Sequence, residues 1–95
     1  MTIEQLRAEG LIGPPLGAGY HIDQFIQRLG LTKAEAAKRI GVSKSTITRV
    51  VNGDSQLSVA LGAKLKQHLD APVELFFRID AEDKAYQVEQ MLKTA

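Results

Sequence analysis

Apolar residues recur at helical intervals over most of this sequence. One helix is indicated by four residues at positions i, i+3, i+4 and i+7: Ile22, Phe25, Ile26 and Leu29. Another is indicated by three leucines spaced four residues apart: Leu61, Leu65 and Leu69. Strands would alternate apolar and polar residues instead, so this spacing favours helices. We therefore expect an all-α protein of about five short helices followed by a C-terminal helix.

The sequence divides into three parts. Residues 1–19 predict a short helix that ends at Gly10 and then a linker rich in Gly and Pro. Residues 20–79 carry most of the helical pattern and form the predicted domain. Residues 80–95 predict a separate C-terminal helix with Asp80 as its N-cap, because an acidic residue there suits both capping and the helix dipole.

Polar residues three positions apart predict where several helices begin. Thr2 with Gln5, and Thr32 with Glu35, have the spacing of capping boxes, in which each side chain bonds the other residue's backbone N–H. Ser43 is a third predicted N-cap.

Two of these short helices are separated by a tight turn within Lys33–Asn52. Ala37 lies inside the first helix, where its small side chain allows a steep helix crossing. Gly41 occupies the turn, which requires a residue that tolerates positive φ. Ile47 and Val50 hold the second helix down and leave its other face free. This spacing is typical of a DNA-reading helix-turn-helix.

The charge is distributed in a way that supports this interpretation. The net charge is only +1, but residues 31–67 contain seven Lys or Arg and two Asp or Glu, whereas the rest contains five and nine. A basic centre with acidic flanks is typical of a small DNA-binding protein, although mixed charge also suits a solvated helical surface.

Composition excludes several other classes of protein. Cysteine is absent, so disulfides and thiolate metal sites are excluded. No apolar run reaches the ~18 residues of a membrane span and no signal peptide is recognisable, so we expect a cytoplasmic protein. His21 and His68 are far apart and lack clustered partners, so we expect no metal, no cofactor and no enzymatic activity.

The second helix of the motif supplies the expected DNA contacts. Five residues on its first turn and free face are expected to read base edges in the major groove: Lys44, Ser45, Thr46, Thr48 and Arg49. Three residues at or near the ends of the two helices are expected to contact the phosphate backbone: Lys33, Ser43 and Asn52.

A single reading face of this kind covers only a few base pairs. Specific binding usually comes from two copies about one helical turn apart on a near-palindromic operator. The mechanism therefore needs a homodimer, and the best candidate interface is a narrow apolar seam in the C-terminal helix that includes Ala85, Val88 and Leu92. The N-terminal segment is the second candidate, and the seam could instead pack on the domain core or contact another partner.

The segment LTKAEAAKRIGVSKSTITRVVNG resembles the Xre/Cro/C1 group of helix-turn-helix regulators, to which lambda repressor belongs. The resemblance implies a lambda-repressor-like fold. It also implies that the positions of Lys44, Ser45 and Arg49 face base edges, and that those of Lys33 and Asn52 contact phosphates.

A narrower resemblance, to HigA-type antitoxins, extends through LSVALGAKLKQHLDAPVELFFRID. It implies a homodimer that represses its own promoter and neutralises a small mRNA-cleaving toxin. The chain differs from that family in having Gly17–Tyr20 in place of His-Pro-Gly-Glu, and Phe76 or Phe77 in place of Trp. Two alternatives are a stand-alone phage- or plasmid-type regulator without a toxin, and a helical interaction module that has lost DNA binding.

Overall fold

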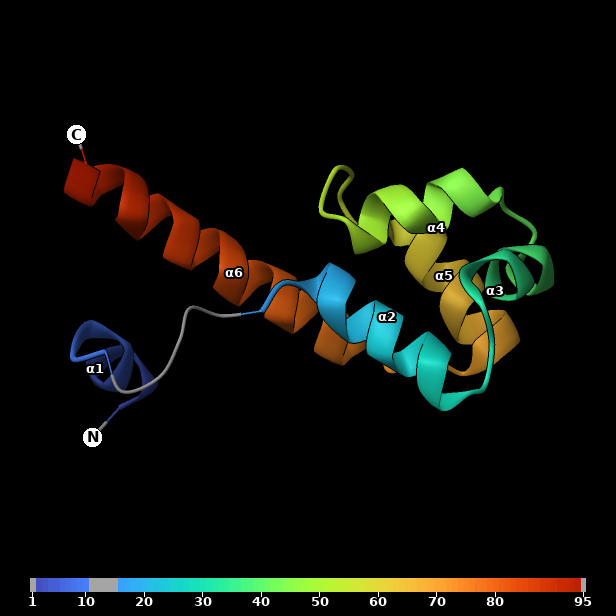
Figure 1. The fold of residues 1–95 in the computed structure, drawn as a ribbon, viewed down its shortest axis with the longest axis horizontal. Helices are drawn as coiled ribbons and strands as arrows, with labels where there is room; N and C mark the ends of the chain where they lie inside the picture. Colours follow the sequence, from blue (N-terminus) through green and yellow to red (C-terminus); the bar gives the residue numbers. More distant parts are fainter. Residues whose placement is uncertain (1, 11–15, 95) are drawn as a thin grey trace.

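The computed structural model describes residues 2–10 and 16–94, and every regular element in these two segments is an α-helix. The six helices, in order, are α1 Ile3–Ala8, α2 Ala18–Arg28, α3 Lys33–Ile40, α4 Lys44–Val51, α5 Val59–Leu69 and α6 Val73–Thr94 (Figure 1). The predicted all-α class is therefore confirmed. Helices α2 to α6 pack against one another, whereas α1 has no packing contact with the other described helices.

Side-chain caps begin the helices at the predicted places. Thr32 Oγ1 accepts a hydrogen bond from the Glu35 N–H at 3.1 Å, and a Glu35 carboxylate oxygen accepts one from the Thr32 N–H, also at 3.1 Å. Thr2 and Gln5 form the same reciprocal pair at the start of α1. Ser43 Oγ accepts from the Thr46 N–H at 3.2 Å. These bonds satisfy backbone donors that the first helical turn leaves unpaired.

The turn between α3 and α4 has the predicted geometry. Gly41 has φ 78° and ψ 35°, the left-handed conformation that glycine adopts without steric cost. Its N–H and that of Val42 both donate to the Ala37 carbonyl, which closes the end of α3. The chain therefore leaves α3 sharply and enters α4 at a steep angle.

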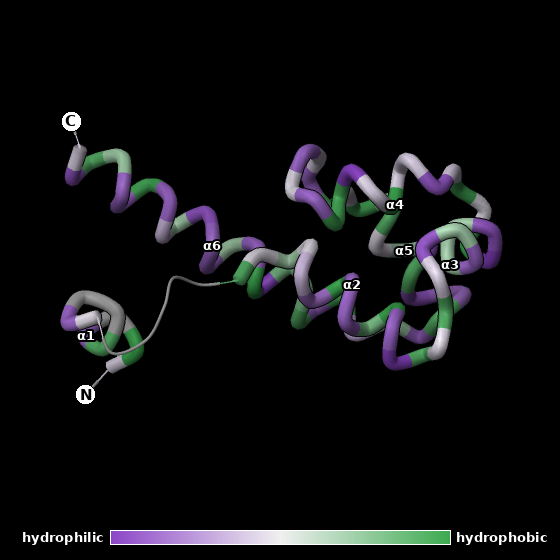
Figure 2. The backbone as a smooth tube through the Cα atoms, in the orientation of Figure 1, coloured by the Kyte–Doolittle hydropathy of each residue, from purple (hydrophilic) through white to green (hydrophobic). Residues whose placement is uncertain are grey.

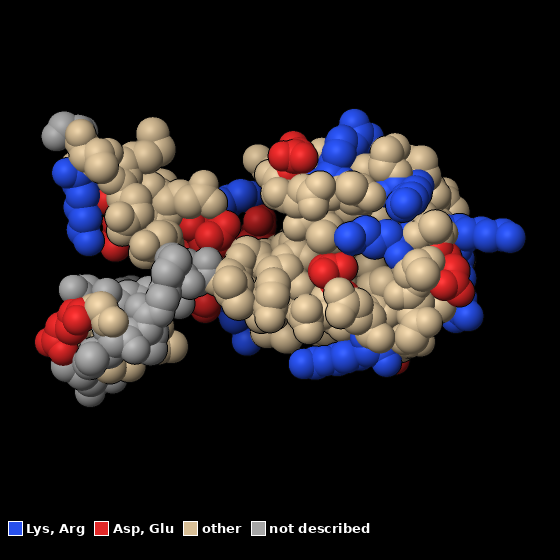
Figure 3. All heavy atoms as spheres, viewed as in Figure 1, with Lys and Arg blue, Asp and Glu red and all other residues tan. Residues whose placement is uncertain are grey.

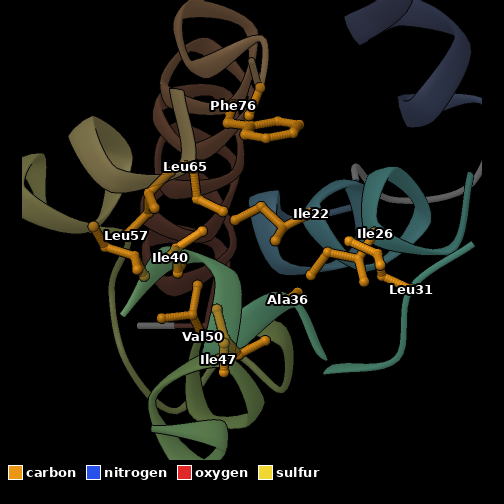
Figure 4. Close-up of a cluster of buried hydrophobic side chains, with 13 residues drawn as sticks. Ile22, Ile26, Leu31, Ala36, Ile40, Ile47, Val50, Leu57, Leu65 and Phe76 are labelled. Atoms are coloured by element: carbon orange, nitrogen blue, oxygen red, sulfur yellow. The ribbon is translucent and has the colours of Figure 1, made fainter. Parts of the chain in front are cut away.

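The core is a single apolar cluster to which α2 to α6 all contribute (Figure 4). Its largest fully buried side chains are Ile22, Ile26, Ile40, Ile47, Leu65 and Phe76. Phe76 meets Phe25 edge to face, with ring centroids 5.9 Å apart. Among the residues described, no polar side chain is buried in this core. Ile47 and Val50 belong to it, so one face of α4 is fixed against the domain and the other faces solvent (Figures 2 and 4).

Helix α2 begins earlier than the sequence predicts. The expected linker extends to residue 19, but Ala18 and Gly19 are already helical. Ala18 is buried, and Gly19 lies against the last turn of α4. Tertiary packing therefore outweighs the low helix propensity of glycine here. The central part of the predicted linker, residues 11–15, lies outside the described residues.

The separate C-terminal helix is the second difference. Residues 73–94 form one continuous helix of 22 residues, about 33 Å long at 1.5 Å per residue. Asp80 is not an N-cap. It lies inside α6, where its carboxylate accepts a hydrogen bond from Lys84 Nζ at 2.9 Å. The first half of α6 packs in the domain, and the second half projects beyond it (Figure 1).

Candidate nucleic-acid interface

Helix α4 presents its predicted reading residues to solvent. Successive residues turn by about 100°, so burial of Ile47 and Val50 directs positions 45, 48, 49 and 52 outward. Lys44, Ser45 and Arg49 are exposed, and Thr48 is half-buried beside them. Asn52, the C-cap of α4, is exposed and continues the same stripe. The structure thus places one basic and hydroxyl-rich face along the whole helix.

The first turn of α4 carries a cluster of three hydroxyl groups. Ser43 Oγ lies 3.1 Å from Ser45 Oγ and 2.9 Å from Thr46 Oγ1. The side chain of Thr46 is half-buried and turns toward this cluster, away from the centre of the outward face. Its geometry fits a residue that positions the cap better than one that reads bases, a distinction that helical spacing alone did not give.

Arg49 is oriented by the backbone of its own helix. Its Nε–H donates to the Ser45 carbonyl at 3.3 Å, which folds the side chain back toward the start of α4. Both terminal nitrogens of the guanidinium group remain free of intramolecular partners among the described residues. They can donate two parallel hydrogen bonds to N7 and O6 of a guanine. Ser45 and the Arg49 side chain therefore lie at the same level of the helix.

Lys33 has a partner that the sequence did not reveal. Its Nζ lies 4.0 Å from one carboxylate oxygen of Asp23 in α2, and the other oxygen accepts a hydrogen bond from Gln27 Nε2 at 3.0 Å. Asp23 and Lys33 are ten residues apart on different helices, so no local pattern predicts the pair. A phosphate contact by Lys33 would have to replace this carboxylate.

Positively charged side chains lie on the surface of the two helices of the motif, α3 and α4. On the face shown in Figure 3, several Lys and Arg side chains project from the surface over α3 and α4 with a few carboxylates among them, and further carboxylates lie along α6. This basic region would attract a polyanion, whereas α6 would not.

The three predicted dimer residues lie on the projecting half of α6. Ala85, Val88 and Leu92 are all exposed, and their 3-residue and 4-residue spacings place them on one side of the helix. Val88 is 57 % exposed and Leu92 is 71 % exposed. These residues form an exposed apolar strip, hereafter the α6 seam.

One of the two histidines is half-buried and the other is exposed. His21 packs against the ring of Tyr20, with centroids 5.3 Å apart, and His68 is exposed near the end of α5. Across residues 2–10 and 16–94, no three His, Cys, Asp or Glu residues come together in a way that could hold a metal ion. Within the same segments, no helix has the length and apolar character needed to cross a membrane.

Solved structures of similar fold include two proteins named for antitoxin activity. A Nostoc punctiforme protein described as an antidote of a plasmid maintenance system superposes with a TM-score of 0.76, at 24 % identity, over 86 % of this chain and 90 % of its own. The antitoxin GraA superposes with a TM-score of 0.71, at 20 % identity, over 84 % and 87 % of the two chains. At these identities the likeness concerns the fold.

Sequence comparison identifies the family. Two Archaeoglobus fulgidus proteins, both named as uncharacterized HTH-type transcriptional regulators, are 32 % identical over 62 residues, which cover 65 % of this chain and 87 % and 89 % of theirs. Residues 22–76, which contain α3, the Gly41 turn and α4, match the family model described as Helix-turn-helix. The predicted Xre-type, lambda-repressor-like fold is thereby confirmed, and the chain belongs to the helix-turn-helix family of transcriptional regulators.

Proposed function

We propose that this regulator is a sequence-specific repressor that binds a near-palindromic operator as a homodimer and serves as the antitoxin of a toxin–antitoxin pair. The observation that carries the DNA-binding part is the outward face of α4. Its hydrophobic side is fixed in the core, while Lys44, Ser45 and Arg49 are exposed on the other side. A packing helix would have no need of so many free donors on that face.

In this proposal α4 enters the major groove with its first turn leading. Lys44 and Ser45 approach the base edges first, and the Arg49 guanidinium reaches the same level because it folds back toward Ser45. Thr48 offers a hydroxyl and a methyl group to the next base pair. Thr46 supports Ser43 and Ser45 and contacts bases through its methyl group only.

Contacts to the phosphate backbone set the register of this helix. Ser43 and Asn52 lie at the two ends of α4, and Lys33 begins α3. Each can donate a hydrogen bond to a phosphate oxygen, and Lys33 also neutralises its charge. Such contacts add affinity without reading sequence, and they make binding fall as the salt concentration rises.

The homodimer would form through the α6 seam. Ala85, Val88 and Leu92 stand away from the domain on a helix whose first half is anchored in the core. Two copies that pair along this strip would hold two α4 helices at a fixed separation. A twofold-symmetric dimer of this kind matches a near-palindromic operator.

The antitoxin role is supported by the two structural neighbours, which are named as an antidote protein and an antitoxin. A small basic mRNA-cleaving toxin is the proposed partner. The negatively charged carboxylates along α6 would attract its positive charge. A stand-alone regulator without a toxin is the second candidate, and it is favoured by the two archaeal relatives, which are named only as transcriptional regulators.

Two experiments test these proposals separately. Selection from random duplex DNA should enrich a near-palindrome with the wild-type chain, and Arg49→Ala should relax one position in each half-site. Enrichment of no sequence would refute specific DNA binding. For the antitoxin role, the reading frame beside the gene should arrest growth when expressed alone and not when expressed with this chain. The antitoxin role is refuted if growth arrest persists when this chain is co-expressed, or if the product of the adjacent reading frame is not toxic. The stand-alone regulator would then be the remaining candidate.

A further inference from the structure

Three helices meet at one junction on the side of the domain where α6 leaves it. The start of α2, the end of α4 and the middle of α6 surround a hollow of about 230 Å³, closed on one side by the loop between α4 and α5. The reading helix and the helix that carries the α6 seam therefore share a common point of attachment. We call it the α2–α4–α6 junction.

Gly19 sets the contact between α2 and α4. A Cβ atom at this position would lie 2.4 Å from the Val50 carbonyl oxygen and 2.6 Å from that of Val51. Both distances are far below van der Waals contact, and both oxygens belong to backbone, which cannot rotate aside as a flexible side chain could. The first turn of α2 is thus pressed directly on the last turn of α4.

The contact between α2 and α6 is also close. A Cβ atom on Gly17 would lie 3.3 Å from an Asp83 carboxylate oxygen. One residue further along α6, Lys84 Nζ donates to Gln56 Oε1 at 3.3 Å and to Asp80 Oδ2 at 2.9 Å. Gln56 lies in the loop after α4, so this bond ties α6 to the segment that follows the reading helix.

Anchoring on α5 limits the movement of α6 further. Gly62 of α5 lies so near Phe77 that a Cβ atom there would be 3.0 Å from two of its ring carbons. Phe76, one residue earlier, is fully buried in the core. Because α6 is one unbroken helix from Val73 onward, these contacts fix the direction of its projecting half as well.

From these contacts we infer that the α2–α4–α6 junction fixes the angle between the reading helix and the dimer helix, and that Gly19 is the residue that sets it. The inference rests on the proposed homodimer and adds a property to it: the dimer accepts one separation of half-sites and rejects its neighbours. Each added base pair moves one half-site by about 3.4 Å and rotates it by about 35°. A rigid dimer cannot follow that change with both α4 helices.

The test uses the selected operator, rebuilt as duplexes whose half-sites are moved apart or together by one and two base pairs, together with a duplex of one half-site. The wild-type chain should bind one separation best and lose up to about a hundredfold when the separation changes by two base pairs, because the second half-site no longer adds avidity.

Gly19→Ala should affect binding to the full operator much more than binding to the half-site duplex. Affinity for the half-site duplex should stay within about twofold, because the outward face of α4 is unchanged. Affinity for the full operator should fall about tenfold or more, and the preferred separation should broaden or shift. Simple destabilisation would lower half-site and full-site binding together, and that result would overturn the inference.

A second variant is needed because Gly19→Ala brings a side chain against backbone. The double variant Gln56→Ala/Lys84→Met removes the hydrogen bond between these two exposed side chains without changing the core. It should also broaden the separation profile, that is, the dependence of affinity on half-site separation. Lys93→Met is the matched control, since Lys93 lies on the same helix without a described partner, and its profile should equal that of the wild type.

The possible failures point to different conclusions. Equal wild-type affinity for all separations would overturn the inference and leave the dimeric repressor intact. A sharp wild-type profile that neither Gly19→Ala nor the double variant changes would also overturn it. A chain that selects no DNA, or binds it only as a monomer, would remove the proposed function and this inference with it.

Discussion

The exposure of the α6 seam allows the contribution of one of its residues to dimer affinity to be calculated. Leu92 is 71 % exposed in the single chain. Full burial of a leucine side chain stabilises by about 1.5–3 kcal/mol, so burial of the exposed share contributes about 1–2 kcal/mol per copy. A twofold-symmetric interface counts each residue twice. Leu92→Gln should therefore weaken the dimer by about 2–4 kcal/mol, which is roughly thirtyfold to several hundredfold in Kd.

The measurement is the monomer–dimer Kd by sedimentation equilibrium, and Met91→Gln is the control. Met91 is 72 % exposed, almost the same as Leu92, but it lies about 100° around the helix from Leu92. Gln has nearly the helix propensity of Leu and Met, so neither variant should change the melting temperature measured at concentrations where the chain is monomeric. The seam assignment is refuted if Leu92→Gln leaves the Kd unchanged, or if the two variants weaken the dimer equally.

Three further predictions concern the motif. Arg49→Lys keeps the charge but loses the planar guanidinium fork, so it should cost about 1–3 kcal/mol at one operator position, and an unchanged preference in binding-site selection would contradict this. Asp23→Asn should strengthen DNA binding and steepen its salt dependence by up to about one counterion, because it frees Lys33 for phosphate. The same gain in a chain that also carries Lys33→Met would disprove that cause. The pKa of Glu35 lies below its ordinary value, chiefly because its carboxylate accepts the Thr32 backbone N–H. The resulting stability is present above the unfolded-state pKa and is lost as the pH falls through the folded-state pKa. Urea titrations at neutral and acidic pH should show this loss of unfolding free energy in the wild type and not in Glu35→Gln, which keeps the capping geometry. An equal change of unfolding free energy with pH in the two proteins would exclude a contribution from Glu35.

Local interactions explain why the motif could be predicted from sequence. The capping box of Thr32 and Glu35, the Ser43 cap and the Gly41 turn each depend on residues within a few positions of one another. The burial of Ile47 and Val50 follows from helical periodicity. In each case the physical cause lies inside a short window, so the sequence pattern contains it.

Features that depend on distant residues were mispredicted or missed. Gly17–Gly19 has the composition of a linker, and Gly19 is helical only because its missing side chain lets α2 rest on the Val50 and Val51 carbonyls. Asp80 has the local character of an N-cap, and only the anchoring of the preceding residues in the core makes α6 continuous there. The Asp23–Lys33 pair joins two helices, so it has no local signature.

The continuity of α6 changes what its seam can do. A free helix of residues 80–95 would be marginal in water, because forming its first turn costs more than the later hydrogen bonds recover. In α6 that first turn is formed at Val73, and Phe76 holds it in the core, so the helix reaches the seam by propagation alone. The seam is then ordered before any partner arrives, and docking does not bear the entropy of folding it. Because the domain fixes the orientation of the seam, the seam in turn fixes the orientation of a second copy that docks on it. The local signals at Asp80 favoured the start of a separate helix, whereas the unbroken helix gives the two reading helices of the proposed dimer a rigid connection.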